Sequence, residues 1–192
     1  MVRRFLKQKE GGRYAMNTKD VTNTALAVTM FTLCSWIAIP IGDVPITLQT
    51  FALCFLSAWL GWKQSLIAII AYLLLGAVGV PVFSGFTGGI GRLLSPTGGF
   101  LIGFLCAAPI IGLWTNTKKE NVKRSRLRLW LGMLLGVLVC YAVGVVWFWI
   151  WLPQTQFLTV LSVAMLPFLL PDFCKIALAV WLYEKLRVLW KK

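Results

Sequence analysis

The most informative absence in this 192-residue sequence is histidine, which does not occur at all. Histidine is the commonest general base and a frequent metal ligand, so its absence argues against most enzymes and most metal sites. The sequence also contains no Walker A pattern, no GxSxG nucleophile elbow and no HExxH motif. We therefore expect a protein that is not an enzyme and that carries no metal or cofactor, and any uphill transport must draw its energy from a partner or an ion gradient.

Cysteine is scarce, and its spacing carries no motif. The five cysteines each lie in a different apolar stretch, without a CxxC pair. Neither a disulfide framework nor a zinc site is indicated, and packing is the expected role for all of them. They are Cys34, Cys54, Cys106, Cys140 and Cys174.

Charged residues are also few, at 13% of the chain against 59% hydrophobic residues. A compact water-soluble domain of this composition could not cover its surface with polar groups, so we predict an integral membrane protein with the lipid bilayer as its solvent. The net charge of +13 could suggest nucleic-acid binding. However, the basic residues fall in short runs between apolar stretches and no nucleic-acid motif is present, so no nucleic-acid partner is expected.

Long apolar runs are what the sequence has in abundance. A membrane-spanning helix needs about 20 residues, and six runs approach or reach that length. We predict an all-α membrane protein in which residues 16–192 form one domain, a compact bundle of six transmembrane helices, and residues 1–15 are an N-terminal extension. The predicted spans are residues 22–39, 47–62, 64–80, 98–114, 127–152 and 171–190.

Two connections between these spans have unusual sequences. The apolar segment 153–170 is interrupted by Pro153 and Pro167 and bounded by Pro171, so we predict a short extracellular helix or lid before the last helix. Segment 79–97 is long and rich in glycine. Its backbone groups would go unpaired in lipid, so it must fold against the bundle or line a wet cavity.

The basic residues are distributed unevenly along this map. With the N-terminus inside, seventeen of the nineteen Lys and Arg residues fall in the terminal segments and the inner loops. Because inner loops normally carry the positive charge, both termini are predicted to be cytoplasmic. The two exceptions are Arg92 and Lys175, which share the outer end with Asp43 and Asp172.

Asp172 and Lys175 follow Pro171, a residue that suits the first turn of a helix. Three residues apart, they share a helix face. A charge inside a membrane segment costs about 3 kcal/mol and by default has a partner or lines a polar cavity. Asp172 either stabilises the helix N-terminus while Lys175 pairs with it or reaches the surface, or the pair contacts a solute, with Lys175 or Arg92 meeting a carboxylate.

Three blocks of the sequence, in this order and spacing, resemble the BioY family, the biotin-binding S components of energy-coupling-factor (ECF) transporters. They are VPITLQTFAL from Val44, GVPVFSGFTGGIGRLLSPTGGFLIGF from Gly79 and PFLLPDFCKIALA from Pro167. The resemblance implies a six-helix subunit of the bacterial cell membrane that binds biotin from outside. It also implies partners, namely a transmembrane coupling protein (T component) and two ABC ATPase subunits.

Carried over to this sequence, the resemblance implies that Asp172 binds the ureido end of biotin and that Lys175 or Arg92 meets its carboxylate. Small residues on the first helix would dock the coupling protein, here Ala25 and Thr29. An S component for another vitamin, and a membrane enzyme using Asp172 and Lys175, remain as alternatives. The further ligand candidates are Gln49 and Thr47 from the first block, and Phe83, Phe86, Gly88 and Gly89 as pocket wall or lid.

Overall fold

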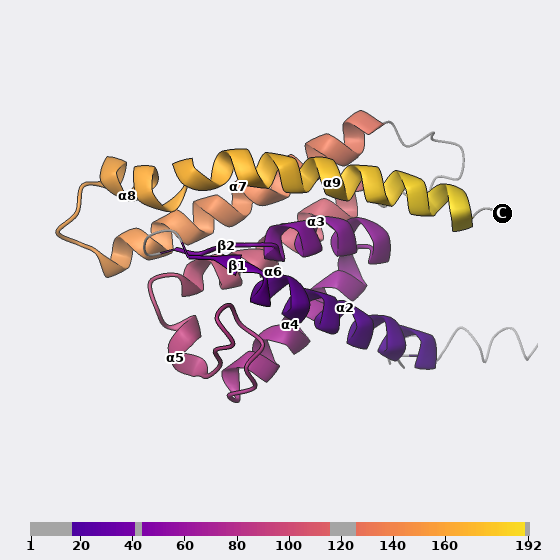
Figure 1. Cartoon of the computed structure of the whole chain (residues 1–192), viewed down its shortest axis with the longest axis horizontal. Helices are drawn as coiled ribbons and strands as arrows, with labels where there is room; N and C mark the ends of the chain where they lie inside the picture. The colour runs from indigo at the N-terminus through magenta and orange to yellow at the C-terminus, as the bar shows by residue number, and fades with distance from the viewer. Residues whose placement is uncertain (1–16, 41–43, 116–125, 191–192) are drawn as a thin grey trace, which may run out of the picture.

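The structure is a computed structural model that describes residues 17–40, 44–115 and 126–190. Helices dominate it, and the strands form one antiparallel pair in which Ala38 faces Thr47 and Ile39 faces Ile46 (Figure 1). The elements in chain order are α2 (Thr18–Trp36), β1 (Ala38–Ile39), β2 (Ile46–Thr47), α3 (Gln49–Leu60), α4 (Trp62–Ala77), α5 (Ile90–Leu93), α6 (Gly98–Thr115), α7 (Arg126–Trp151), α8 (Phe157–Ala164) and α9 (Leu166–Trp190).

Each of the six predicted spans forms a helix, and the expected short helix before the last one is α8, so the predicted all-α class is confirmed. Three described segments are long and apolar enough to cross a membrane, namely Gly98–Thr115, Arg126–Trp151 and Phe157–Val188, which joins α8 and α9. Helix α3 has 12 residues and α4 has 16. At 1.5 Å per residue, α3 covers about 18 Å of a hydrocarbon core of about 30 Å. Because α2, α3 and α4 are not among these three segments, it stays a prediction that they cross the whole membrane.

Large apolar side chains remain exposed on the outer faces of the helices. In water such a surface is a liability, whereas in a bilayer it contacts acyl chains. The most exposed of them include Leu74, Leu158 and Leu170, at 61%, 73% and 75%. This exposure agrees with the expected membrane environment.

Glycine allows α6 and α7 to pack closely. A Cβ atom added at Gly136 would lie 2.3 Å from Cγ1 of Ile111, and one at Gly103 would lie 3.0 Å from the carbonyl oxygen of Cys140. In a membrane the lipid tails are as apolar as the helices, so no hydrophobic force drives the helices together. Small residues at the contacts allow the close van der Waals packing that does. The pair provides a fixed wall against which the rest of the bundle packs.

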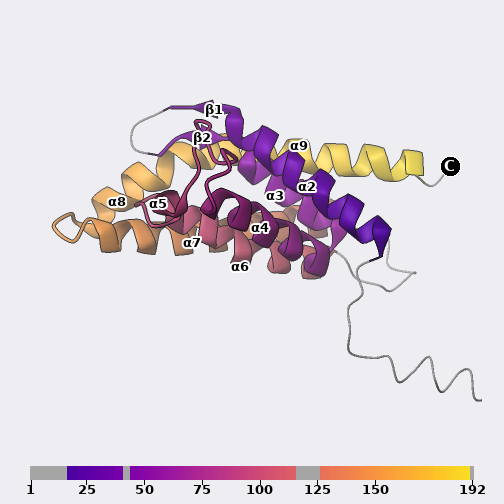
Figure 2. The ribbon, with the colours of Figure 1, turned by 90° about the horizontal axis from the view of Figure 1, so that it is seen from below.

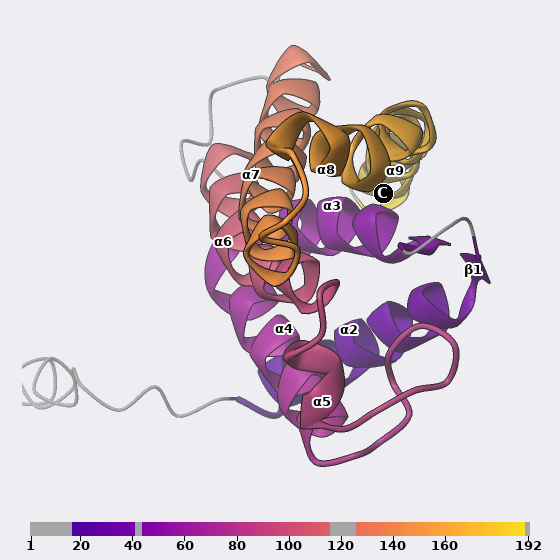
Figure 3. The same ribbon diagram turned by 90° about the vertical axis from the view of Figure 1, so that its left-hand side faces the viewer.

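The bundle has two distinct ends. Helix α2 begins and α9 finishes at one end, whereas the β1–β2 hairpin, α5 and α8 gather at the other (Figure 2). Viewed from the hairpin end, α6 and α7 lie on one side, α2 and α4 below, and α9 opposite, with α3 among them (Figure 3). At the end where α9 finishes, Arg126 and Glu184 form an exposed ion pair of 2.7 Å between α7 and α9.

The start of α9 differs from the prediction. The helix begins at Leu166, so Pro171 lies inside it and the proline of its first turn is Pro167. A bend at Met165 separates α8 from α9, and the Phe168 N–H donates to the Met165 carbonyl at 3.0 Å. Several prolines in one apolar segment made the choice of the first-turn proline ambiguous, and the prediction placed it at Pro171 wrongly.

The glycine-rich segment 79–97 folds against the bundle, as predicted. Its Phe83 N–H donates to the Thr87 carbonyl at 2.9 Å, and the indole of Trp36 on α2 donates to the Pro81 carbonyl at 2.9 Å. Residues 90–93 form the short helix α5. These contacts bring segment 79–97 next to the hairpin, where both border a cavity.

Candidate ligand-binding site

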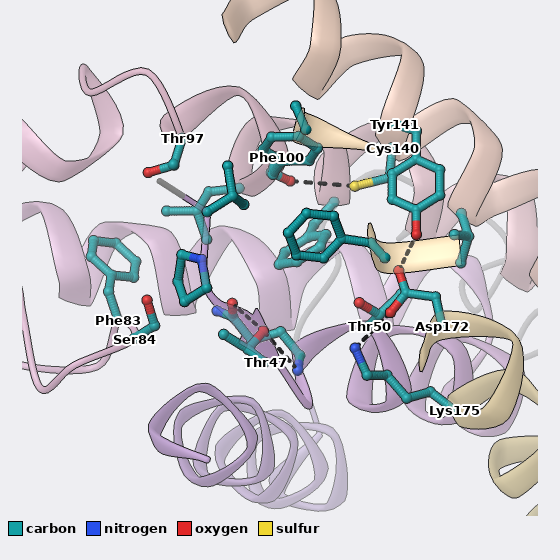
Figure 4. Close-up of a pocket in the computed structure, with 18 of the residues that line it drawn as sticks. Thr47, Thr50, Phe83, Ser84, Thr97, Phe100, Cys140, Tyr141, Asp172 and Lys175 are labelled. Carbon is teal, nitrogen blue, oxygen red and sulfur yellow. Dashed lines mark hydrogen bonds and ion pairs between the residues drawn. The ribbon is translucent and has the colours of Figure 1, made fainter. Parts of the chain in front are cut away.

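One pocket lies at the hairpin end of the bundle, between α3, α6, α7 and α9 and the segments that carry Val44 and Phe83 (Figure 4). It encloses about 720 Å³ of space free of protein atoms, open solvent at its mouth included. The residues that line it are Val44, Pro45, Thr47, Gln49, Thr50, Phe83, Ser84, Arg92, Thr97, Phe100, Leu101, Phe104, Val137, Cys140, Tyr141, Ala164, Phe168, Asp172 and Lys175.

One side of the pocket holds a buried ion pair. Lys175 Nζ donates to Asp172 Oδ1 at 2.6 Å, and the hydroxyl of Tyr141 on α7 donates to the other oxygen, Asp172 Oδ2. Asp172 is 4% exposed and Lys175 is 7% exposed. A buried charge pair is tolerated where further hydrogen bonds satisfy it, and Tyr141 supplies one here. Within the described part of the chain each carboxylate oxygen accepts one hydrogen bond, which leaves each a further lone pair for a ligand.

Of the first expectation for Asp172, the structure shows the ion pair with Lys175 but not the place at a helix N-terminus. The helix macrodipole acts within the first turn, whereas Asp172 lies beyond the first turn of a helix that begins at Leu166. Its partners are side chains, from its own helix and from α7. The Asp172 carboxylate therefore belongs to the pocket wall and not to a helix terminus.

The opposite side of the pocket carries Arg92. Its Nη2 donates to Ser84 Oγ at 3.3 Å, a long contact with a neutral partner. Figure 4 shows Ser84, Phe83 and Thr97 lying away from Asp172, across the cavity. Arg92 is half-buried, and among the residues that the structure describes no carboxylate lies within ion-pair distance of it. The guanidinium is a cation available to an incoming anion.

Polar groups also lie between these two ends. Gln49, the first residue of α3, is 6% exposed, and its Oε1 accepts a hydrogen bond of 3.0 Å from Thr47 Oγ1. Thr47 itself belongs to β2, although the prediction placed it in the second span. The hairpin thus replaces the outer part of that span and brings Thr47 beside Gln49.

Apolar side chains form the remaining walls of the cavity. Phe100 and Phe104 come from α6, Val137 from α7 and Phe168 from α9. Phe100 packs directly on Gly144, where an added Cβ atom would lie 2.3 Å from Phe100 Cδ1. The site is therefore an apolar slot with a charged group at each end, the usual design of a small-molecule pocket.

Six of the nine predicted ligand residues line this one pocket: Asp172, Lys175, Arg92, Gln49, Thr47 and Phe83. The other three do not. Phe86 is 63% exposed and stacks on Trp36 with a centroid distance of 4.8 Å. Gly88 packs so tightly that a Cβ atom would lie 2.5 Å from the Val80 carbonyl oxygen, and Gly89 has a φ of +97°. A lid role for these three stays a prediction.

Sequence reasoning missed Tyr141 as a site residue. It is the single hydroxyl-bearing residue in the 26-residue helix α7, and that isolation was a signal the sequence offered. Ser84 and Thr50 were also missed as lining residues. Among the described residues, no group of three or more His, Cys, Asp or Glu side chains could hold a metal ion.

Comparison with known proteins identifies the chain. The BioY family profile matches residues 7–192. The chain belongs to the BioY family. A probable biotin transporter BioY of Pyrococcus horikoshii is 39% identical over 173 residues, which cover 90% of this chain and 98% of that protein. The biotin transporter BioY of Thermotoga maritima is 35% identical over 172 residues, covering 89% and 97%.

A solved structure shares the fold. The crystal structure of the S-component for biotin from an ECF-type ABC transporter superposes with a TM-score of 0.81 at 30% identity. The match covers 90% of this chain and 95% of the other. The bundle described above is therefore that of a BioY-family membrane protein.

Proposed function

We propose that this protein captures biotin as the S component of an ECF-type ABC transporter. The observation that carries the proposal is the pair of charged ends of one apolar pocket, with Asp172 and Lys175 at one end and Arg92 at the other. Family membership and the names of the relatives support it. The role is binding and transport, not catalysis.

The chemistry of biotin matches this pocket from end to end. A ureido group presents two N–H donors and one carbonyl acceptor, an apolar bicycle and chain follow, and a carboxylate ends the molecule. The carboxylate of Asp172 accepts hydrogen bonds from the ureido N–H groups. Lys175 donates to the ureido carbonyl, because its ammonium group has N–H donors beyond the one given to Asp172, whereas the single Tyr141 hydroxyl proton already goes to Asp172. The aromatic walls, Phe100 and Phe104 among them, contact the bicycle and chain.

In this assignment Arg92 binds the carboxylate of biotin. Lys175 is already neutralised by Asp172 at 2.6 Å, whereas Arg92 has only the neutral Ser84 as a partner among the described side chains. A guanidinium also matches a carboxylate in two-point geometry. The sequence left Lys175 and Arg92 as equal candidates, and this charge balance favours Arg92.

The proposed partners are a transmembrane coupling protein and two ABC ATPase subunits, whose ATP hydrolysis moves biotin inward. The docking residues of the prediction, Ala25 and Thr29, are both exposed on α2, and Thr29 Oγ1 donates to the Ala25 carbonyl at 2.9 Å. Because that bond satisfies the hydroxyl within its own helix, the surface of α2 there is small and nonpolar enough for a close helix contact.

The proposed orientation places both termini in the cytoplasm and the pocket at the outer face of the cell membrane. Helix α2 begins and α9 finishes at the end of the bundle opposite the pocket (Figure 1). The positive-inside rule assigns that end to the cytoplasm. Biotin would then enter from outside through the end that carries the hairpin and α5.

Ligand binding by the purified protein tests this function. We expect saturable binding of biotin by isothermal titration calorimetry, and no binding of thiamine or riboflavin at the same concentrations. Binding of one of those vitamins in place of biotin would assign the scaffold to another substrate. Recovery of chemically unchanged biotin after incubation separates binding from an enzymatic role.

A further inference from the structure

Tyr72 lies outside the pocket lining but contacts two residues that belong to it. It is fully buried in the middle of α4, the one polar side chain between Leu66 and Gly79. Its hydroxyl bonds to Gln49, and its ring meets the ring of Phe83 edge to face at a centroid distance of 5.5 Å. A buried tyrosine usually finds one partner for its hydroxyl, whereas this one has two.

The directions of these hydrogen bonds are fixed by one carbonyl group. The Val82 carbonyl oxygen lies 3.0 Å from Tyr72 Oη and 2.5 Å from Ser35 Oγ. A carbonyl oxygen can only accept, so the Tyr72 hydroxyl donates to it, and the one Ser35 hydroxyl proton is shared between this oxygen and the Thr32 carbonyl oxygen at 2.9 Å. The single proton of the Tyr72 hydroxyl is therefore donated to the Val82 carbonyl oxygen. Toward Gln49, Tyr72 Oη can only accept.

The hydrogen bond from Tyr72 to Val82 determines the orientation of the Gln49 side-chain amide. Gln49 Nε2 donates to Tyr72 Oη at 2.7 Å, and Gln49 Oε1 accepts from Thr47 Oγ1 at 3.0 Å. With the amide flipped, Oε1 would face Tyr72 Oη with no proton between them, which is unfavourable in a buried site. One N–H and one lone pair of the Gln49 amide remain, each in a defined position, for a ligand.

The same tyrosine supports Phe83. The Phe83 ring sits over Gly76, one helical turn along α4 from Tyr72, where an added Cβ atom would lie 2.0 Å from Phe83 Cζ. The neighbouring Val82 carbonyl receives the Tyr72 hydroxyl proton. Backbone and ring of this part of segment 79–97 are therefore both held by α4.

We propose that Tyr72 is a positioning residue of the ligand site, which sets the donor and acceptor pattern of Gln49 and the placement of Phe83 without touching the ligand. Its consequence for biotin rests on the proposed function. Its consequence for Gln49 does not, because the hydrogen bonds described above exist in the protein without a ligand.

The first test uses ligand-free protein labelled with ¹⁵N in glutamine, with the Gln49 side-chain signal assigned from a Gln49→Ala variant. We expect slow solvent exchange of the Gln49 amide protons in the wild type and exchange at least about tenfold faster in Tyr72→Phe, because one buried hydrogen bond is lost. Tyr183→Phe, which removes another buried tyrosine hydroxyl outside the pocket lining, is the matched control and leaves Gln49 exchange unchanged. Unchanged exchange in Tyr72→Phe would overturn the proposal.

The second test is a double-mutant cycle on biotin affinity. Tyr72→Phe keeps the ring over Phe83, and Ser35 still donates to Val82, so the variant is expected to fold. We expect an affinity about tenfold lower in Tyr72→Phe and a clearly smaller loss when the change is added to Gln49→Ala, since only the support of Val82 and Phe83 is then left to lose. An equal loss in both backgrounds would contradict the positioning role.

The two tests keep the two claims apart. Failure of the wild type to bind biotin would overturn the proposed function, and the exchange measurement would still decide the role of Tyr72. Biotin binding by the wild type, with unchanged Gln49 exchange and unchanged affinity in Tyr72→Phe, would overturn the role of Tyr72 alone.

Discussion

The two ends of the pocket use charge in opposite ways. At the helix end, Asp172 and Lys175 are buried, paired at 2.6 Å and supported by Tyr141, so the group is neutral overall and fixed between α7 and α9. At the loop end, Arg92 is half-buried on the short helix α5 and bonds only to Ser84 among the described side chains. The first end is a preorganised set of donors and acceptors, and the second is a cation without an ion-pair partner among residues 17–40, 44–115 and 126–190.

This difference explains how one slot can recognise an asymmetric ligand. A neutral ureido group needs directed donors and acceptors and gains little from net charge, which suits the ion-paired end. A carboxylate needs a cation and tolerates partial exposure, which suits Arg92. The comparison predicts that changes at the helix end alter both folding and binding, whereas changes at the loop end alter binding alone.

The largest effect is expected from Lys175→Met. This variant leaves the Asp172 charge buried with Tyr141 as its remaining donor among the described side chains, and breaking such a pair costs roughly 3–5 kcal/mol of folding stability. Thermal unfolding in detergent should show a markedly lower Tm, and biotin binding should be lost. The double variant Asp172→Asn/Lys175→Met should regain much of the stability but none of the binding. A Tm equal to that of the wild type in the single variant would mean that the ion pair does not hold the helix end together.

Arg92→Gln should separate binding from folding. Losing a charge-assisted hydrogen bond is expected to weaken biotin binding by about 10- to 150-fold, corresponding to roughly 1.5–3 kcal/mol. Because the one side-chain hydrogen bond of Arg92 among the described residues is the long one to Ser84, the Tm of the ligand-free protein should stay close to that of the wild type. A large fall in Tm would show that the loop end is as structural as the helix end.

Tyr141→Phe should give an intermediate effect. It removes one donor to Asp172 while keeping the ion pair with Lys175, so we expect a loss of about 1 kcal/mol in stability and about tenfold in biotin affinity. Calorimetry and thermal unfolding measure both quantities on one preparation. Unaltered affinity would remove Tyr141 from the ligand site and leave it as a packing residue.

The smallest effect is expected from Arg126→Gln, at the opposite end of the bundle. Its ion pair with Glu184 links the same two helices as Tyr141 and Asp172, but the Arg126 side chain is 72% exposed. Solvent screens an exposed ion pair almost completely, so stability should change little and biotin affinity not at all. A change in affinity would indicate that the spacing of α7 and α9 is coupled along their whole length.

The sequence predicted the charged residues of the pocket better than it predicted their partners. Asp172, Lys175 and Arg92 could be found because charge is rare on the outer side and the basic residues otherwise follow the positive-inside rule. Tyr141 comes from a helix 31 residues away in sequence from Asp172, a contact that no local pattern encodes. The role of Tyr72 could not be predicted from the sequence for the same reason.

Local backbone detail was the other limit of prediction. The choice between Pro167 and Pro171 for the first turn of α9 depended on a bend at Met165 that proline spacing does not determine. The hairpin that carries Thr47 has two-residue strands, too short for any alternating pattern to show. Phe86 resembled a wall residue in sequence but turns outward onto Trp36.

The most direct test of the account compares biotin with its uncharged carboxamide, each titrated into the wild type and Arg92→Gln by calorimetry. If Arg92 meets the carboxylate, the wild type should bind the amide about 10- to 150-fold more weakly than biotin. Arg92→Gln should bind both ligands with similar, reduced affinity, since the interaction is then missing in either case. Equal binding of biotin and its amide by the wild type would contradict the assignment of the two ends of the pocket.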